Sequence, residues 1–291
     1  MILSNLEALQ SALRTIPKNA PEYPAAWRSL SDAPETLYAL GNLSLLQTHK
    51  LAIVGSRRTP ANVVKIGEEL AKQLSQSYTL VTGTADGGDT VAIRGALSGS
   101  GKLICLLAGG FAYLPQGNLD LLERVTKTGL LLSLHPFETE IRAFSYEYRN
   151  KLLSALCDGA LILSAGEKSG ALITAKYAKE FGKKLFALPY PPNAAAGVGC
   201  NGLIKQGAKL TETAADVLEE FGVQIQEQKP QLLLSEDEQK LYEALQSLGE
   251  SHVSVLSQSS GVPIFKARAV LSALEVKGIA VSLGGNVYTL V

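Results

Sequence analysis

The chain has 291 residues, 46% of them hydrophobic and 19% charged, a composition that supports a sizeable core and excludes wholesale disorder. Twenty-seven basic residues balance twenty-seven acidic ones, so a bulk basic field is excluded and nucleic-acid binding would depend on a local patch. Three widely spaced cysteines, without Cys/His spacing for a metal, predict thiols in a reducing compartment. With neither a signal-peptide pattern nor a membrane-spanning apolar run, we expect a cytoplasmic protein.

Residues 1–48 are expected to form an N-terminal extension that packs on the sheet. Leucines at positions 6, 9 and 13 recur at helical spacing and predict a short helix. Prolines at positions 17, 21, 24 and 34 break the pattern that follows. We therefore predict a helical and turn-rich segment whose apolar residues lie against the following domain.

Residues 49–223 alternate short apolar runs with helical patterns, and we predict that they form one domain. The runs are candidates for buried strands and the intervening segments for helices. Predicted strands are 51–54, 79–82, 102–107, 130–134, 160–163 and 184–188, and predicted helices are 61–76, 89–97, 118–127, 149–156 and 173–181. This alternation predicts an α/β fold with a doubly wound, mostly parallel sheet, in which ligands bind beyond the carboxyl ends of the strands.

The best-defined motif is the stretch from 51 to 60. Its apolar run is typical of a strand buried on both faces, and Gly55 allows the backbone to turn sharply and approach a ligand closely. A helix follows, so backbone N–H groups are available at a helix start for a phosphate or another anion. Arg57 and Arg58 add fixed positive charge. The candidate binding residues here are Gly55, Ser56, Arg57 and Arg58.

A second candidate stretch, 142–151, interleaves three basic residues with three aromatic ones. Such a mixture suits single-stranded nucleic acid, because bases stack on rings while phosphates meet cations. The alternative is a solvated loop with buried aromatics, and Asn150 beside Arg149 at a predicted helix start could be a simple cap. The candidate residues are Arg142, Tyr146, Arg149, Asn150 and Lys151.

A third candidate lies at 169–176, where glycine and hydroxyl residues precede a predicted helix. This turn is again suited to an anion. Thr174 could bind phosphate or bond back to its own helix, and Lys176 could face ligand or water. The candidate residues are Ser169, Gly170, Thr174 and Lys176.

No pair of residues typical of a catalytic centre is evident. His135 stands at a strand end without a partner acid or nucleophile, and a lone histidine is more often packed than catalytic. We therefore expect a binding protein and not an enzyme, with no metal and no cofactor.

The C-terminal region is predicted to be a separate small domain. Residues 224–232 are polar and are predicted to form a linker, and 233–291 show three helical patterns and a terminal hairpin around 284–286, which predicts a winged helix. Ser235 and Glu238 form a capping-box pattern at the first helix. Between 230 and 291, four basic residues stand against six acidic ones, so protein contact or packing is at least as plausible as DNA binding.

Taken in order, these motifs resemble the DprA/Smf family, the DNA-processing proteins of natural transformation. The resemblance is carried by Gly55-Ser56-Arg57, by the glycine loop from Gly83 to Asp89, by Arg149-Asn150, and by the block from Ser169 to Ala175. It extends over nearly the whole chain beyond the first twenty or so residues. Asp86 departs from the pattern, because the family usually has a basic residue there, and Leu134 replaces a usual glutamate.

The resemblance implies a Rossmann-like domain that forms a homodimer, binds single-stranded DNA in a basic pocket and loads the RecA recombinase. By motif, the pocket would comprise Gly55, Ser56, Arg57, Tyr146, Arg149, Asn150 and Lys151, with Arg142 as a cation just upstream. The alternative is a nucleotide-binding or nucleotide-hydrolysing enzyme of the lysine-decarboxylase-like phosphoribohydrolase type. Its proline-glycine-glycine-x-glycine-threonine motif is missing at 168–172. A nucleotide-sensing module without a DNA role would need the same anion pocket.

Overall fold

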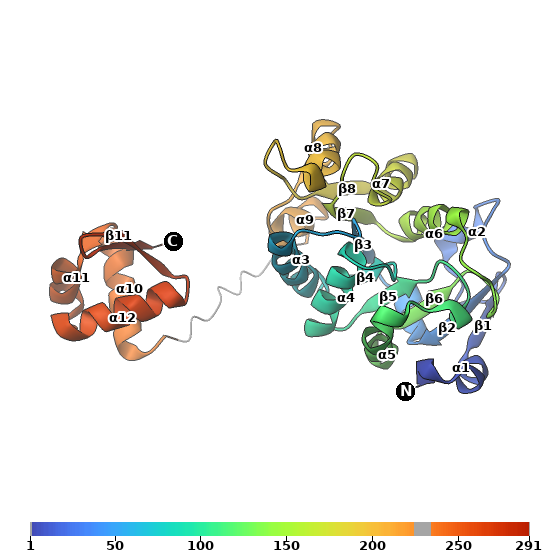
Figure 1. Cartoon of the computed structure of the whole chain (residues 1–291), viewed down its shortest axis with the longest axis horizontal. Coiled ribbons are helices and arrows are strands. Elements are labelled where there is room, and N and C mark those ends of the chain that lie inside the picture. Colours follow the sequence, from blue (N-terminus) through green and yellow to red (C-terminus); the bar gives the residue numbers. More distant parts are fainter. Residues whose placement is uncertain (1, 224–233, 291) are drawn as a thin grey trace. The chain divides into compact units, whose positions relative to one another are not determined.

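The computed structural model describes residues 2–223 and 234–290 (Figure 1). The chain divides into two compact units, Met1–Ile225 and Gln226–Val291. The predicted linker, 224–232, lies outside the described residues, so the predicted domain boundaries remain predictions. Within the described ranges, none of the helices combines the length and apolar character that a bilayer crossing requires.

A nine-stranded sheet forms the centre of the first unit, with the strand order β1-β2-β6-β5-β4-β3-β7-β8-β9. Neighbours from β6 through β9 in this order pair in parallel, whereas β1 with β2 and β2 with β6 are antiparallel. The predicted mostly parallel sheet is therefore confirmed. The strands are β1 Arg14–Pro17, β2 Thr36–Gly41, β3 Lys50–Gly55, β4 Thr79–Thr82, β5 Leu103–Leu106, β6 Leu130–Ser133, β7 Gly159–Ser164, β8 Lys184–Ala187 and β9 Lys209–Leu210.

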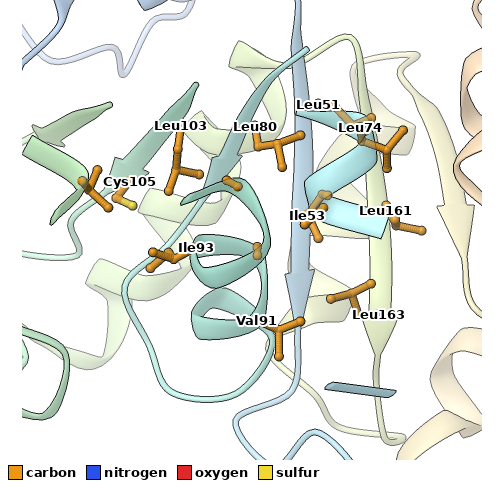
Figure 2. Packing of buried hydrophobic residues seen from close by; sticks show 14 of the residues in the cluster. Leu51, Ile53, Leu74, Leu80, Val91, Ile93, Leu103, Cys105, Leu161 and Leu163 are labelled. Carbon is orange, nitrogen blue, oxygen red and sulfur yellow. The ribbon is translucent and has the colours of Figure 1, made fainter. Parts of the chain in front are cut away.

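Helices cover both faces of this sheet. On the central strand β3, Leu51 and Ile53 pack into the layer under α3 and α4 (Figure 2), and the alternate residues Ala52 and Val54 pack into the opposite layer with α6 and α7. Burial on both faces explains why the strand is an unbroken apolar run in the sequence. The α-helices of this unit are α1 Leu6–Ala12, α2 Ala25–Arg28, α3 Ala61–Leu74, α4 Gly88–Ser98, α5 Leu119–Thr128, α6 Ala143–Leu156, α7 Ala171–Glu180, α8 Val198–Lys205 and α9 Ala214–Glu220.

The N-terminal extension contains the predicted helices and turns. It also contributes two strands to the sheet, which the prediction lacked. Strand β2 joins β6 at the edge and β1 pairs outside it. Besides its two strands, the extension packs on α6. Trp27 is fully buried, and its indole Nε1–H donates to the Leu152 carbonyl at 2.8 Å. The alternating pattern of β2, with Leu37 and Ala39 buried, was the overlooked signal in the sequence.

Over residues 234–290, the second unit contains three helices and a three-stranded antiparallel sheet around its own apolar core. The predicted capping box is confirmed, since the Ser235 N–H donates to Glu238 at 2.7 Å and the Glu238 N–H donates to Ser235 at 3.4 Å. The predicted hairpin is present and turns through residues with positive φ, Gly285 and Asn286. The winged-helix assignment itself remains a prediction. The elements are α10 Glu236–Leu248, β10 Ser251–His252, α11 Val253–Ser260, α12 Ile264–Val276, β11 Ala280–Gly284 and β12 Val287–Leu290.

Candidate functional site

A cavity of about 640 Å³ opens at the carboxyl ends of β3, β4 and β7. The chain winds outward from β3 toward β4 on one side and continues from β7 toward β8 on the other, so this is the point where the strand order reverses. Open α/β sheets place ligands at such a switch point. We call this cavity the arginine pocket; its polar and charged lining comprises Ser56, Arg57, Arg58, Asp89, Tyr146, Arg149, Asn150, Lys168, Ser169 and Thr174.

Two glycine loops that line the pocket through Gly55 and Asp89 meet backbone to backbone. A Cβ built on Gly88 would lie 2.2 Å from the Gly55 Cα, and Gly87 has a φ of +80° that side chains disfavour. The Gly88 N–H donates to the Ser56 carbonyl at 3.1 Å. The two loops can approach this closely only because glycine occupies these positions.

The turn after β3 is held by hydroxyl groups and presents its arginines outward. The Ser56 N–H donates to the carbonyl and the Oγ of Ser164, at 2.8 and 3.0 Å. Arg57 and Arg58 are exposed, and the Arg57 guanidinium lies 5.1 Å from the centre of the Tyr146 ring, a cation–π contact. The sequence motif therefore produces a rigid turn with two solvent-facing cations at the mouth.

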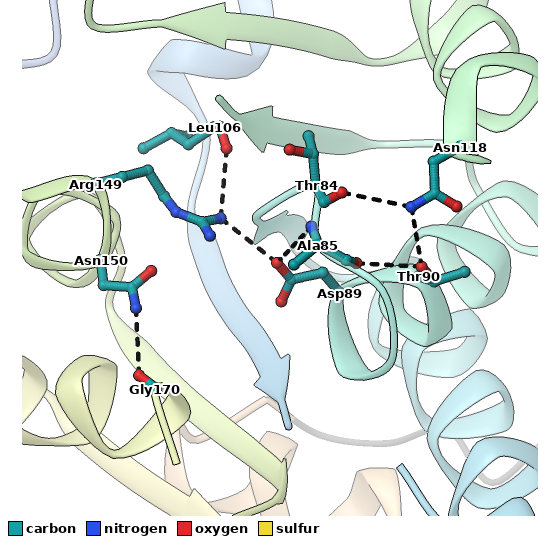
Figure 3. A network of polar contacts seen from close by, with 9 residues as sticks. All are labelled: Thr84, Ala85, Asp89, Thr90, Leu106, Asn118, Arg149, Asn150 and Gly170. Carbon is teal, nitrogen blue, oxygen red and sulfur yellow. Dashed lines mark hydrogen bonds and ion pairs between the residues drawn. The ribbon is translucent and has the colours of Figure 1, made fainter. Parts of the chain in front are cut away.

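Arg149 lies at the floor of the pocket and is only 4% exposed. Its Nη1 atom is 3.5 Å from the Asp89 carboxylate and 3.4 Å from the Leu106 carbonyl (Figure 3). Burial raises the pKa of Asp89, and the neighbouring guanidinium and the Ala85 N–H, which donates at 3.2 Å, oppose that rise. Arg149 is therefore a buried counter-ion that joins α6 to the loop after β4.

Two other buried groups at the floor have no hydrogen-bond partner among the described residues, the Arg149 Nε and the Thr174 Oγ1. The Thr174 hydroxyl thus does not bond back to its helix, which was one of its two predicted roles. Asn150 donates from Nδ2 to the Gly170 carbonyl at 3.3 Å, which ties α6 to the turn before α7 (Figure 3). Both residues line the pocket, but these two atoms are themselves buried and do not face it.

The stretch 142–151 is helical almost from its start, which corrects the prediction that the helix begins at Arg149. Helix α6 starts at Ala143, so this stretch is not a loop and Asn150 is not a cap. The helix is fixed at its first turn, where the Arg142 N–H donates to the Ser145 Oγ at 3.1 Å. The mixed polar and aromatic pattern hid the helix, since its apolar face begins only at Leu152.

Ten of the thirteen predicted site residues line the arginine pocket, and Arg142, Lys151 and Lys176 do not. Arg142 lines a neighbouring cavity, and Lys151 pairs with Asp32 at 2.6 Å. Lys176 is exposed on another face of α7, 3.9 Å from Glu180. Adjacent helical positions point in different directions, so a contiguous motif cannot place all of its side chains in one cavity.

Sequence reasoning missed two charged residues of this pocket, Asp89 and Lys168. Asp89 follows the glycine pair of the second loop, and Lys168 directly precedes Ser169, so both were adjacent to recognised motifs. The described lining residues then include four cations and one carboxylate, Asp89; the cations are Arg57, Arg58, Arg149 and Lys168. The wall of the pocket therefore carries three excess positive charges, although the chain as a whole is neutral.

Fold and site together define an α/β protein with a cationic pocket at the switch point of a doubly wound sheet. The sequence model of the family "DNA recombination-mediator protein A" matches residues 14–222. The chain belongs to this family, the DprA/Smf DNA-processing proteins.

Curated relatives agree with this assignment. The chain is 35% identical to the DNA processing protein DprA of Bacillus subtilis over 218 residues, which cover 73% of this chain and 72% of the relative. It is 32% identical to the protein Smf of Escherichia coli over 285 residues, which cover 94% and 76%.

Two solved structures are similar. The DprA of Streptococcus pneumoniae has a TM-score of 0.69 at 32% identity, with 75% of this chain and 77% of that chain covered. The DprA of Helicobacter pylori has a TM-score of 0.65 at 30% identity, with 72% and 95% covered, and was described for its single-stranded DNA binding mode.

Proposed function

We propose that the arginine pocket binds single-stranded DNA and that the protein protects an incoming strand and loads RecA on it during natural transformation. The observation that carries this proposal is the local charge of the pocket in a chain with no net charge. Local excess charge attracts a polyanion, and the phosphate backbone supplies most of the affinity in such complexes.

The groups at the mouth suit a flexible strand. Arg57, Arg58 and Lys168 are exposed and form no ion pair with any residue in the described ranges, so they are available to phosphates. Tyr146 adds an aromatic ring beside Arg57, on which a base can stack. The strand-binding mode described for the Helicobacter pylori relative supports the same assignment.

We propose further that the protein acts by binding and not by turnover. Among the described residues that line the pocket, Asp89 is the single carboxylate; it is only 5% exposed and lies 3.5 Å from Arg149, so it is poorly placed to activate a water. A free nucleotide remains the alternative ligand, because its phosphate would use the same cations. Incubation with nucleoside monophosphates should release no base; turnover would reject this part of the proposal.

We propose RecA loading and dimerisation on the ground of family membership. We expect sedimentation velocity to give about twice the mass of one chain, which is 30.8 kDa. We expect RecA filaments to form faster on strand already coated with a single-strand-binding protein when this protein is present. A monomer, or an unchanged filament rate, would contradict the respective proposal.

Fluorescence anisotropy tests DNA binding directly. A labelled oligothymidine and a duplex of equal length are titrated over a salt series with the wild type, with Arg57→Ala and with Arg124→Ala, which removes an exposed arginine outside the pocket. We expect preference for the single strand. We also expect the slope of the logarithm of the binding constant against the logarithm of salt concentration to become shallower by about 0.7 for each phosphate contact that is lost. Arg57→Ala should bind more weakly than the wild type and Arg124→Ala should not. Equal weakening in both variants would place the site elsewhere.

A further inference from the structure

A second cavity, of about 500 Å³, lies at the same edge of the sheet, beyond the carboxyl ends of β5 and β6. We call it the Phe144 cavity; it is lined by Tyr113, His135, Glu138, Thr139, Glu140, Arg142, Phe144 and Ser145. We propose that it holds the base of a neighbouring nucleotide of the bound strand and favours bases with an exocyclic amine. This inference rests on the proposed binding of single-stranded DNA in the arginine pocket.

The first turn of α6 separates the two cavities. Phe144 lines one cavity and Tyr146 lines the other. Residues two apart on a helix rise by about 3 Å and point to different sides of it. A strand held at the arginine pocket therefore needs to cross only one helical turn to bring another base to Phe144.

Phe144 has the geometry of a stacking surface. Its side chain is 63% exposed, although burial of a phenyl ring is ordinarily favourable. It is held on a fixed turn, because Ser145 is buried and accepts the Arg142 N–H at its Oγ. Because the backbone of this turn is fixed, the exposed ring is already presented at the cavity, and a base can stack on it.

The walls of the Phe144 cavity are preformed by two loops joined through their backbones. The Gly110 N–H donates to the Thr139 carbonyl at 2.8 Å, and the Ala112 N–H donates to the Phe137 carbonyl at 3.0 Å. A Cβ at Gly110 would lie 2.1 Å from the Phe137 carbonyl, so a glycine is required there. A preformed cavity reduces the cost of ordering on binding.

The charge of this cavity is opposite to that of the arginine pocket. Glu138 and Glu140 stand against one cation, Arg142, and the Tyr113 hydroxyl donates to Glu140 at 3.2 Å and orients it. A surplus carboxylate disfavours phosphate but accepts hydrogen bonds from amines, and Glu is a natural acceptor for the N4 amine of cytosine. Thymine offers an oxygen at that position, which a carboxylate disfavours. His135 also lines the cavity, but its Nε2 atom is buried, without a partner among the described residues.

The test compares oligodeoxycytidine and oligothymidine of equal length by fluorescence anisotropy. We expect the wild type to bind the cytidine strand about fivefold more tightly, as one base-edge contact of this kind provides. The double variant Glu138→Ala/Glu140→Ala should lose this preference and bind both strands with equal affinity. Its affinity for oligothymidine should be no lower than that of the wild type. Glu7→Ala, at an exposed position on α1, is the control and should keep the preference.

The ring is tested separately. Phe144→Ala should weaken binding of both strands by about tenfold, the effect of removing one base–aromatic stack, and Phe144→Trp should restore it. Leu6→Ala, which removes another exposed apolar side chain, should have no effect. The inference is overturned if the wild type binds both strands equally, or if Phe144→Ala binds like the wild type while Arg57→Ala does not. A wild type that binds neither strand would instead overturn the proposed function.

Discussion

The guanidinium of Arg149 occupies the space where a side chain at position 83 would begin. A Cβ built on Gly83 would lie 1.3 Å from the Arg149 Nη1 and 2.3 Å from the Asp89 carboxylate. No positive φ is involved, so Gly83 is required by this close approach and not by its backbone conformation. The buried ion pair and the glycine loop are therefore one structural unit, and α6 is positioned through it.

Gly83→Ala tests this unit. The new methyl group should displace the Arg149 side chain from Asp89 and leave both charges buried without a partner. Removal of one partner of a buried ion pair typically costs about 3–5 kcal/mol. We expect the free energy of unfolding to fall by no more than this amount. Unfolding is followed by the fluorescence of Trp27, the single tryptophan, which is fully buried in the first unit. Gly117→Ala is the control, since a Cβ there meets nothing within 4 Å; equal stability of the two variants would contradict the argument.

The pair itself is tested by a double-mutant cycle. Arg149→Met should destabilise the first unit by about 3–5 kcal/mol because it leaves the Asp89 carboxylate buried and unpaired. Asp89→Asn should do likewise, and the double variant should be destabilised by much less than the sum of the two. Urea unfolding of the four proteins, read at Trp27, gives the coupling energy. Additive effects would show that the two side chains act independently and that Arg149 is free to act as a phosphate ligand.

The fold was largely predictable because the central strands are buried on both faces and form apolar runs in the sequence. Leu51 to Val54 is one example, and the predicted strand at 79–82 matches β4 residue for residue. The edge strand β1 was missed because only Ile16 of its four residues is buried, so it carries almost no pattern. The start of α6 was missed because its first turns face two cavities and solvent, where core packing does not impose an apolar pattern.

The part of the candidate site that is formed by backbone at strand ends could be predicted from the sequence. The part that is formed by side chains from distant elements could not. Gly55 and Ser56 follow a strand directly, so their place at the sheet edge comes from topology alone. The contact of Arg149 with Asp89 joins residues sixty positions apart, and no local pattern reports it. For the same reason the sequence could not distinguish Arg149, a buried counter-ion, from the exposed Arg57.

His135 should make the stability of the first unit depend on pH. Burial lowers its pKa below 6.5, and its ring packs 5.8 Å from that of Tyr148. The unfolded chain therefore takes up the proton first as the pH falls, so the free energy of unfolding should decrease from pH 7 downward through 6.5 until the folded pKa is reached. His135→Gln should flatten this slope in urea titrations. A slope unchanged by His135→Gln would assign it to other groups.

Lys168 and Lys176 provide a matched pair that separates position from charge. Both are exposed lysines eight positions apart, but Lys168 lines the arginine pocket while Lys176 pairs with Glu180 outside it. Because phosphate contacts are local, Lys168→Ala should weaken oligothymidine binding about fivefold. The slope of the logarithm of the binding constant against the logarithm of salt concentration should become shallower by about 0.7. Lys176→Ala should stay within twofold of the wild type, and so should Lys151→Ala, whose lysine is held by Asp32. Equal weakening for Lys168→Ala and Lys176→Ala would mean that the strand responds to the overall charge of the first unit, and the arginine pocket would then not be the site that holds it.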